Sequence, residues 1–129
     1  MTTIAKFTDL KAWEEAHNLT LFVYKYTKTF PRSETFGITS QLRRAAVSIE
    51  SCIAEGFARF HYKDRLTFYY DARGSISEVQ SQVITAKDLR YLNQAEFEEI
   101  WRQSETVAII LGGLIRSTEN LSQKKSKIT

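Results

Sequence analysis

The chain has 129 residues, of which 43% are hydrophobic and 26% are charged, so it is long enough for one domain with its own core and too hydrophobic for a disordered segment. A single cysteine, Cys52, excludes an internal disulfide and a cysteine-based structural zinc site. The formal net charge of +3 permits contact with nucleic acid without requiring it.

Four amphipathic helices are predicted, and the first covers about Asp9 to Thr29. Its apolar residues recur three or four positions apart, which places them on one face of a helix. Asp9 suits the N-cap position. The pair Phe30-Pro31 ends the helix because proline disfavours a helical residue before it. The apolar stripe consists of Ala12, Ala16, Leu19, Val23, Tyr26 and Phe30.

The second helix is expected from a cap at Thr39 to about Phe60, and the third from about Lys63 to Tyr91. Gly56, in the second apolar stripe, would let a neighbouring helix approach closely. Gly74 lies inside the third helix at a cost of about 1 kcal/mol relative to alanine, which either a tight packing contact or a kink would explain. The two stripes are Leu42, Ala46, Ile49, Ile53, Gly56 and Phe60, and Tyr69, Ala72, Ile76, Val79, Val83 and Ala86.

The fourth helix is predicted to begin after Asn93, because Asn93 and Glu96 have the spacing of a capping box. Its apolar stripe comprises Phe97, Ile100, Ser104, Val107, Leu111 and Leu114. Four helices joined by short connectors favour an all-α fold, an antiparallel up-down-up-down four-helix bundle. We expect a single domain over residues 1–121, followed by a basic flexible tail over residues 122–129 that carries Lys124, Lys125 and Lys127.

Polar residues form a second row on helix two and another on helix three. Both rows are either solvated faces or partly buried surfaces that pair between helices or between subunits. We favour contacts between subunits, since the rows contain small residues and one helix pair can rarely use all of them. The rows are Gln41, Arg44, Ser48, Cys52, Glu55 and Arg59, and Asp64, Asp71, Ser75, Glu78 and Gln82. The candidate interface residues are Gln41, Arg44, Ser48, Glu55, Gly56, Gly74, Ser75 and Glu78.

Several motifs along the chain resemble those of one protein family. They are Phe7-x-Asp9-Leu10-x-x-Trp13-x-x-Ala16, Phe30-Pro31-x-x-Glu34-x-Phe36-Gly37-x-Thr39-x-Gln41-Leu42-Arg43-Arg44-Ala45-Ala46-x-Ser48-Ile49, Ile53-Ala54-Glu55-Gly56-x-x-Arg59 and Ala72-x-Gly74-Ser75-x-x-Glu78. Together they resemble the four-helix-bundle proteins encoded within intervening sequences of bacterial large-subunit ribosomal RNA genes. The resemblance covers roughly Phe7 to Leu121. The chain departs from the family pattern at Glu50, often a proline there, and at Cys52, often an asparagine.

The resemblance implies a four-helix bundle that assembles into a ring, commonly a pentamer. The resembling family is related to the accessory proteins of diversity-generating retroelements, whose similar basic pentameric barrel binds nucleic acid and a reverse transcriptase. These likenesses imply an architecture rather than an activity.

No catalytic residue, metal site or cofactor is predicted. Arg59 precedes His61 too closely for the arginine–histidine spacing of small helical ribonucleases, and Gly112-Gly113 lacks the lysine and hydroxyl residue of a phosphate-binding loop. The longest strongly apolar run, Val107 to Ile115, is too short to span a bilayer. Because residues 1–8 carry no apolar core of a signal peptide, we expect a cytoplasmic protein without membrane contact. The missing catalytic motifs favour a non-enzymatic protein.

Basic and aromatic residues gather at the predicted turn between helices two and three. Arginine and lysine there would meet phosphates, and an exposed aromatic ring would stack on a base; the alternative is an ordinary charged turn whose aromatic rings pack inward. The candidate nucleic-acid-binding residues are Arg43, Arg44, Arg59, Lys63 and Arg65. The leading hypothesis is a homo-oligomer, with a pentamer favoured, that binds RNA or DNA or a nucleic-acid enzyme. The alternative is a scaffold protein whose partner is another protein.

Overall fold

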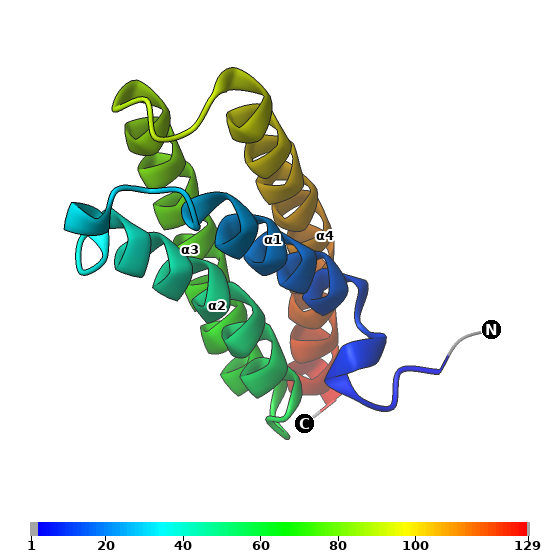
Figure 1. Ribbon diagram of the computed structural model, residues 1–129. Helices are drawn as coiled ribbons and strands as arrows, with labels where there is room; N and C mark the ends of the chain where they lie inside the picture. Colours follow the sequence, from blue (N-terminus) through cyan, green and yellow to red (C-terminus); the bar gives the residue numbers. More distant parts are fainter. Residues whose placement is uncertain (1–2, 129) are drawn as a thin grey trace.

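Four α-helices and two short 3₁₀ turns make up the computed structural model, which describes residues 3–128 and the side chains of residues 3–125. The elements in chain order are η1 (Phe7–Asp9), α1 (Lys11–Thr27), η2 (Arg32–Glu34), α2 (Ile38–Phe57), α3 (Tyr62–Asp88) and α4 (Gln94–Ile128). Contacts join α1 to α2, α2 to α3, α3 to α4 and α4 back to α1. Consecutive helices run antiparallel (Figure 1), so the predicted all-α four-helix bundle is confirmed.

The core lies between the four helices and is built from the predicted apolar stripes. Leu19, Leu42, Val79 and Leu111, one from each helix, are completely buried. Burying a side chain of this kind stabilises the fold by about 1.5–3 kcal/mol relative to leaving it exposed. Phe60 is the exception among the predicted core residues: it is 81% exposed, because α2 ends at Phe57 and the chain has turned away.

The predicted N-cap of the first helix is wrong by one residue. Leu10 holds the N-cap position of α1, which begins at Lys11. The carboxylate of Asp9 instead accepts hydrogen bonds from the backbone N–H groups of Ala5 and Lys6, at 3.0 and 3.1 Å. These bonds belong to the preceding 3₁₀ turn, and they lower the pKa of Asp9 because they favour its charged form.

The start of α2 also differs from the prediction, whereas that of α4 is confirmed. Gly37 holds the N-cap position of α2, and Thr39 is buried inside the first turn instead of capping it. At α4, the Asn93 side chain accepts a hydrogen bond from the Glu96 N–H at 2.8 Å, and the Glu96 side chain accepts one from the Asn93 N–H at 2.9 Å. This reciprocal pair is the predicted capping box.

The last helix extends further than the predicted domain boundary at residue 121. α4 continues to Ile128, and no glycine or proline interrupts residues 122–128. The flexibility expected for residues 122–129 stays a prediction, and the side chains of residues 126–129, Lys127 among them, lie outside the described residues. Within residues 3–128, no helix is long and apolar enough to cross a membrane.

Candidate functional site

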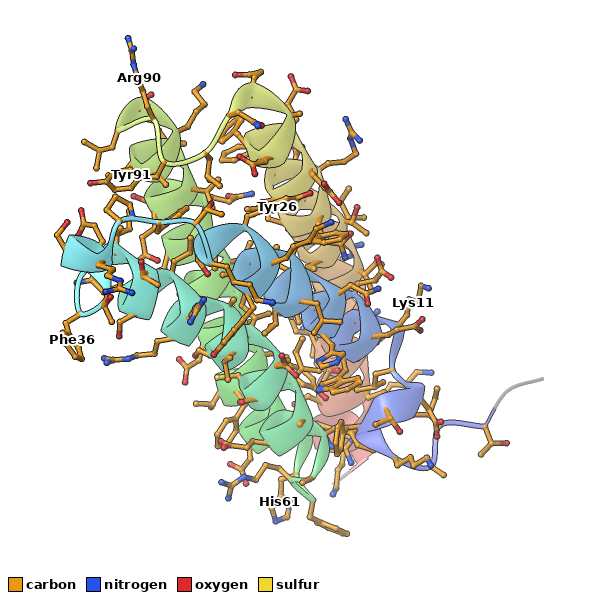
Figure 2. All side chains as sticks on the ribbon, viewed as in Figure 1. Lys11, Tyr26, Phe36, His61, Arg90 and Tyr91 are labelled. Carbon is orange, nitrogen blue, oxygen red and sulfur yellow. The ribbon has the colours of Figure 1, made fainter. Side chains whose placement is uncertain are left out.

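The structure divides the predicted nucleic-acid-binding residues between the two ends of α2. Arg43 and Arg44 lie in its second turn, whereas Arg59, Lys63 and Arg65 lie just beyond its last residue. At 1.5 Å per helical residue, the two groups are about 20 Å apart. Figure 2 labels Phe36 and His61, which lie at these opposite ends. The five residues therefore belong to two separate sites.

The first site, here termed the basic end, consists of Arg59, Phe60, His61, Lys63, Arg65 and Lys125. Its guanidinium groups are held against aromatic rings. Arg59 Cζ lies 4.6 Å from the centre of the Phe68 ring, and Arg65 Cζ lies 5.2 Å from that of Phe57. Arg65 Nε also donates a hydrogen bond to the carbonyl oxygen of Arg59 at 2.7 Å. Arg65 therefore stabilises the end of α2 as well as adding charge.

One aromatic ring of the basic end is turned towards solvent. Phe60 does not pack inward; its ring meets that of His61 edge-on, with centres 5.1 Å apart. Lys125 of α4 places its Nζ 5.3 Å from the centre of the Phe60 ring. Lys63 is exposed beside them, and Asp64 is the acidic neighbour in the first turn of α3. A cation from α4 therefore lies over an accessible ring at the α2–α3 turn, and Arg59 and Lys63 are near this ring along the chain.

The two polar rows lie side by side on one face of the bundle, here termed the α2–α3 face. Ser48 Oγ and Ser75 Oγ share a hydrogen bond of 3.0 Å between the helices. Gln82 is half-buried, and its Oε1 has no hydrogen-bond partner among the described side chains. Glu55 and Glu78 are exposed and form no ion pair within residues 3–125. Among the side chains of residues 3–125, the two rows are joined between the helices by this serine pair, and pairing of the rows between subunits stays a prediction.

The two glycines among the candidate interface residues have different surroundings. A Cβ on Gly56 would lie 2.7 Å from Tyr69 Cε1 and 3.0 Å from Phe68 Cβ, so this glycine lets α2 and α3 approach closely. A Cβ on Gly74 would have no neighbouring atom within 4 Å. The tight contact considered for Gly74 is therefore absent from the described part of the chain, and that glycine leaves open space on the exposed side of α3.

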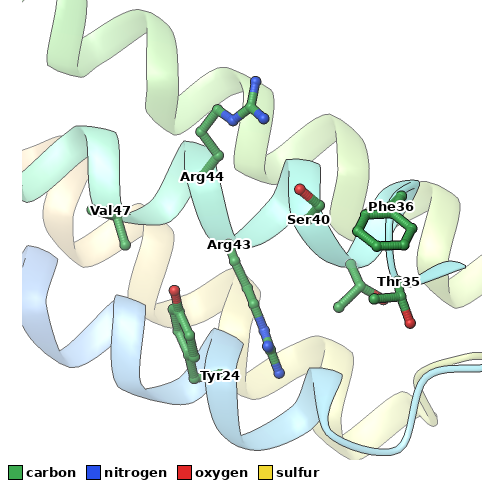
Figure 3. A pocket seen from close by; sticks show the side chains of 8 residues that line it. Tyr24, Thr35, Phe36, Ser40, Arg43, Arg44 and Val47 are labelled. Atoms are coloured by element: carbon green, nitrogen blue, oxygen red, sulfur yellow. The ribbon is translucent and has the colours of Figure 1, made fainter. Parts of the chain in front are cut away.

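The second site, here termed the arginine hollow, has a volume of about 450 Å³ and lies beside the first turns of α2 (Figure 3). Arg43 is held in place, because its Nε donates a hydrogen bond to Thr27 Oγ1 at 2.8 Å and its Cζ lies 4.5 Å from the centre of the Tyr24 ring. Arg44 is exposed. The lining residues are Tyr24, Thr35, Phe36, Thr39, Ser40, Arg43, Arg44 and Val47.

Outside the basic end and the arginine hollow, the described titratable side chains do not form a cluster that suggests a metal site. Within the described residues, no group of three or more histidine, cysteine, aspartate or glutamate side chains could hold a metal ion. His17 stacks on Trp13 with ring centres 4.9 Å apart, and its Nδ1 lies 3.1 Å from Glu50 Oε2. Glu50, which stands where the resembling family often has proline, therefore links α2 to α1. The thiol of Cys52 lies 3.8 Å from Ser48 Oγ, and burial raises its pKa.

Two comparisons with known proteins agree with this architecture. Residues 8–113 match the family described as 23S rRNA-intervening sequence protein. The fold is similar to the crystal structure of a protein with unknown function from the S23 ribosomal protein family of Bacteroides thetaiotaomicron, with a TM-score of 0.74 and 17% sequence identity over 81% of this chain and 95% of that one. At this identity, the likeness concerns the fold alone. Among curated proteins, no match is found.

Proposed function

The chain belongs to the 23S rRNA-intervening sequence protein family, and from that premise we propose that it is a non-enzymatic, oligomeric protein that binds RNA or DNA, or an enzyme acting on them, through its basic end. The observation that carries the proposal is the exposed Phe60 ring, which Lys125 approaches and which is close in the chain to Arg59 and Lys63. The pentameric, nucleic-acid-binding accessory proteins that are related to the resembling family support the same function.

The basic end has the two kinds of group that bind single strands. Arg59 and Lys63 supply positive charge for phosphates, and the Phe60 ring offers a face on which a base stacks without regard to sequence. Stacking of Arg59 on Phe68 restricts the guanidinium before any ligand arrives, which lowers the entropy lost on binding. The site therefore favours single-stranded nucleic acid over base-specific reading of a duplex.

Oligomerisation would use the α2–α3 face in this proposal. Glu55 and Glu78 have no partner within the described chain, Gln82 Oε1 is buried without a hydrogen bond, and Gly74 leaves room for a second backbone. A ring, with a pentamer favoured, repeats the basic end around its axis. Several weak sites on one strand then bind more tightly than one. Measuring the solution mass by light scattering at low and at high salt tests whether the protein forms an oligomer. A monomer at both salt concentrations would contradict the proposed assembly.

A pair of charge-matched variants tests the nucleic-acid site. Arg59→Gln/Lys63→Gln removes two charges from the basic end and leaves Arg65 to stabilise α2. Lys28→Gln/Arg102→Gln removes two exposed charges elsewhere. Binding of a fluorescein-labelled single-stranded RNA is followed by anisotropy over a range of salt concentrations. The first variant should bind more weakly, with the slope of log K against log salt reduced by about 0.7 for each lost phosphate contact; the control should behave as wild type.

Failure of wild-type protein to bind the RNA at low salt would overturn the proposal and favour the alternative, a scaffold with a protein partner. Equal loss in the two variants would show that binding is not located at the basic end. The same samples, incubated with magnesium, test the non-enzymatic part: the RNA should remain intact, and its cleavage by purified protein would contradict that part.

A further inference from the structure

Four charged side chains on the outer sides of α2 and α4, away from the core, have no oppositely charged partner within residues 3–125. Arg44 and Glu55 of α2 and Glu105 and Arg116 of α4 are all exposed. None of the four takes part in an ion pair among these described side chains. Arg44 leaves α2 on the side away from Arg43 (Figure 3), so it remains open to a partner from outside the chain.

The two helices carry these charges at the same spacing and in opposite order. Glu55 follows Arg44 by eleven residues, and Arg116 follows Glu105 by eleven residues. Eleven residues make about three turns, so both charges lie on one side of their helix, about 16 Å apart along its axis. If α4 of one copy lies parallel to α2 of another, Arg44 is level with Glu105 while Glu55 is level with Arg116. An antiparallel arrangement brings like charges together, which is unfavourable.

The bundle presents α2 and α4 in the way that this parallel arrangement requires. Consecutive helices are antiparallel, so α2 and α4 run in the same direction (Figure 1). Within residues 3–128 no contact joins them, because α1 and α3 each lie between them. Their outer sides are therefore on opposite sides of the bundle. A contact between two such different surfaces repeats from copy to copy and closes into a ring when the rotation between copies permits it.

The two surfaces also match in shape between the charged positions. Ile109 is 74% exposed on α4, and in the parallel arrangement it lies beside Val47, which is 37% exposed on α2. Burying these apolar side chains against each other would stabilise the contact. Gly112 comes level with Ser51, and a Cβ on Gly112 would meet only the flexible end of Arg116 within 4 Å among the described atoms. Two small residues facing each other allow the helices to approach closely.

From these features we infer that the outer side of α4 docks on the outer side of α2 of a second copy of the chain, with Glu105 against Arg44 and Arg116 against Glu55. The inference rests on the proposed oligomerisation, and it identifies the surface that covers the α2 row of the α2–α3 face. None of the four residues belongs to the basic end, so the contact can be removed while that site stays intact.

Charge reversal and restoration in the full chain test this contact. Light scattering over a dilution series gives the concentration at which half of the oligomer dissociates. Glu55→Arg should raise that concentration about tenfold, since it places two arginines together at each contact, and Arg116→Glu should do the same with two glutamates. Glu55→Arg/Arg116→Glu should restore the wild-type value. Glu14→Arg, a reversal at an exposed position of α1, is the matched control and should leave the value unchanged.

A second pair of variants tests the apolar part of the contact. Ile109→Ala should raise the dissociation concentration about tenfold, because less apolar surface is buried between the copies. Leu21→Ala removes a side chain that is 54% exposed on α1, and it should have no effect. Because both side chains are exposed, the circular dichroism spectra of these variants should match that of wild type.

The outcomes separate this contact from oligomerisation itself. A wild-type oligomer that persists unchanged in both single charge variants overturns the inference and leaves the proposed assembly standing. Tighter assembly of Glu55→Arg also overturns it, because in the antiparallel arrangement Glu55 faces Glu105. Dissociation of both single variants without recovery in the double variant overturns the pairing with Arg116. A wild-type monomer at every concentration overturns the proposed assembly together with the contact.

Discussion

Replacing Gly56 by alanine is expected to destabilise the bundle, although alanine is the better helix former. The new Cβ would lie 2.7 Å from Tyr69 Cε1, and Tyr69 is 1% exposed, so its ring has no solvent to move into. Overpacking of this kind costs about 2–3 kcal/mol. The helix propensity of alanine offsets about 1 kcal/mol of that. The free energy of unfolding should therefore fall by about 1–2 kcal/mol.

Gly74→Ala is the matched control on the neighbouring helix. A Cβ at this position meets nothing within 4 Å in its own chain, so in the isolated chain only the propensity term remains, and the folded monomer should gain about 1 kcal/mol. Thermal unfolding followed by circular dichroism should show opposite shifts, of roughly 4 °C per kcal/mol for a domain of this size. Gly56→Leu should disrupt the bundle altogether. A Gly56→Ala variant that melts at or above the wild-type temperature would refute the close approach of α2 and α3 at Tyr69.

Three further predictions concern side chains outside the two sites. Asn93→Ala should lower the free energy of unfolding by about 1 kcal/mol in urea, because the capping box that starts α4 is lost; an unchanged midpoint would contradict the cap. The hydrogen bond to Glu99 raises the pKa of Tyr26 from 10.0 to about 12, so the folded chain holds this proton longer than the unfolded chain. The resulting stability is complete below pH 10 and is lost as the pH rises towards 12, and Tyr26→Phe should flatten this part of the urea-midpoint profile; an unaltered profile would contradict it. Cys52 should react more slowly with iodoacetamide in the folded chain than in urea, because burial raises its thiol pKa, and equal rates would contradict that burial.

The helices are predictable from the sequence, whereas two of their starting residues are not. Apolar residues spaced three or four apart correctly place Leu19, Leu42, Val79 and Leu111 in one core. The Asp9 carboxylate, however, can bond the backbone of either a 3₁₀ turn or α1, and only the folded chain shows that it bonds the turn. The spacing of apolar residues therefore predicts that a helix is present. The residue at which the helix begins depends on which of the nearby backbone N–H groups the capping side chain bonds.

The sites are less predictable because they depend on which distant segments meet. Arg59, Lys63 and Arg65 are close in sequence and remain close in the structure. Lys125 joins them only because α4 is long enough to reach the α2–α3 turn, and its place in the lysine-rich C-terminal segment was the available signal. Residue type alone groups Arg43 and Arg44 with them, and the length of α2 separates these two arginines from the basic end by about 20 Å.

Similar reasoning explains the contrast between Gly56 and Gly74. Each is a glycine inside a predicted helix, and the sequence makes both candidate interface residues that would allow a close contact. Only the packing of α2 against α3 shows that Gly56 faces the Tyr69 ring inside the chain while Gly74 faces open space.

The most direct test of the central claim is to map where a single strand touches the protein. A labelled single-stranded RNA is cross-linked to the full chain by ultraviolet light, and the modified peptide is identified by mass spectrometry. Cross-links are expected at Phe60 or Tyr62, which are next to Arg59 and Lys63 in the chain at the α2–α3 turn. Cross-links confined to other helices, or no cross-link at low salt, would contradict the claim that the basic end binds nucleic acid.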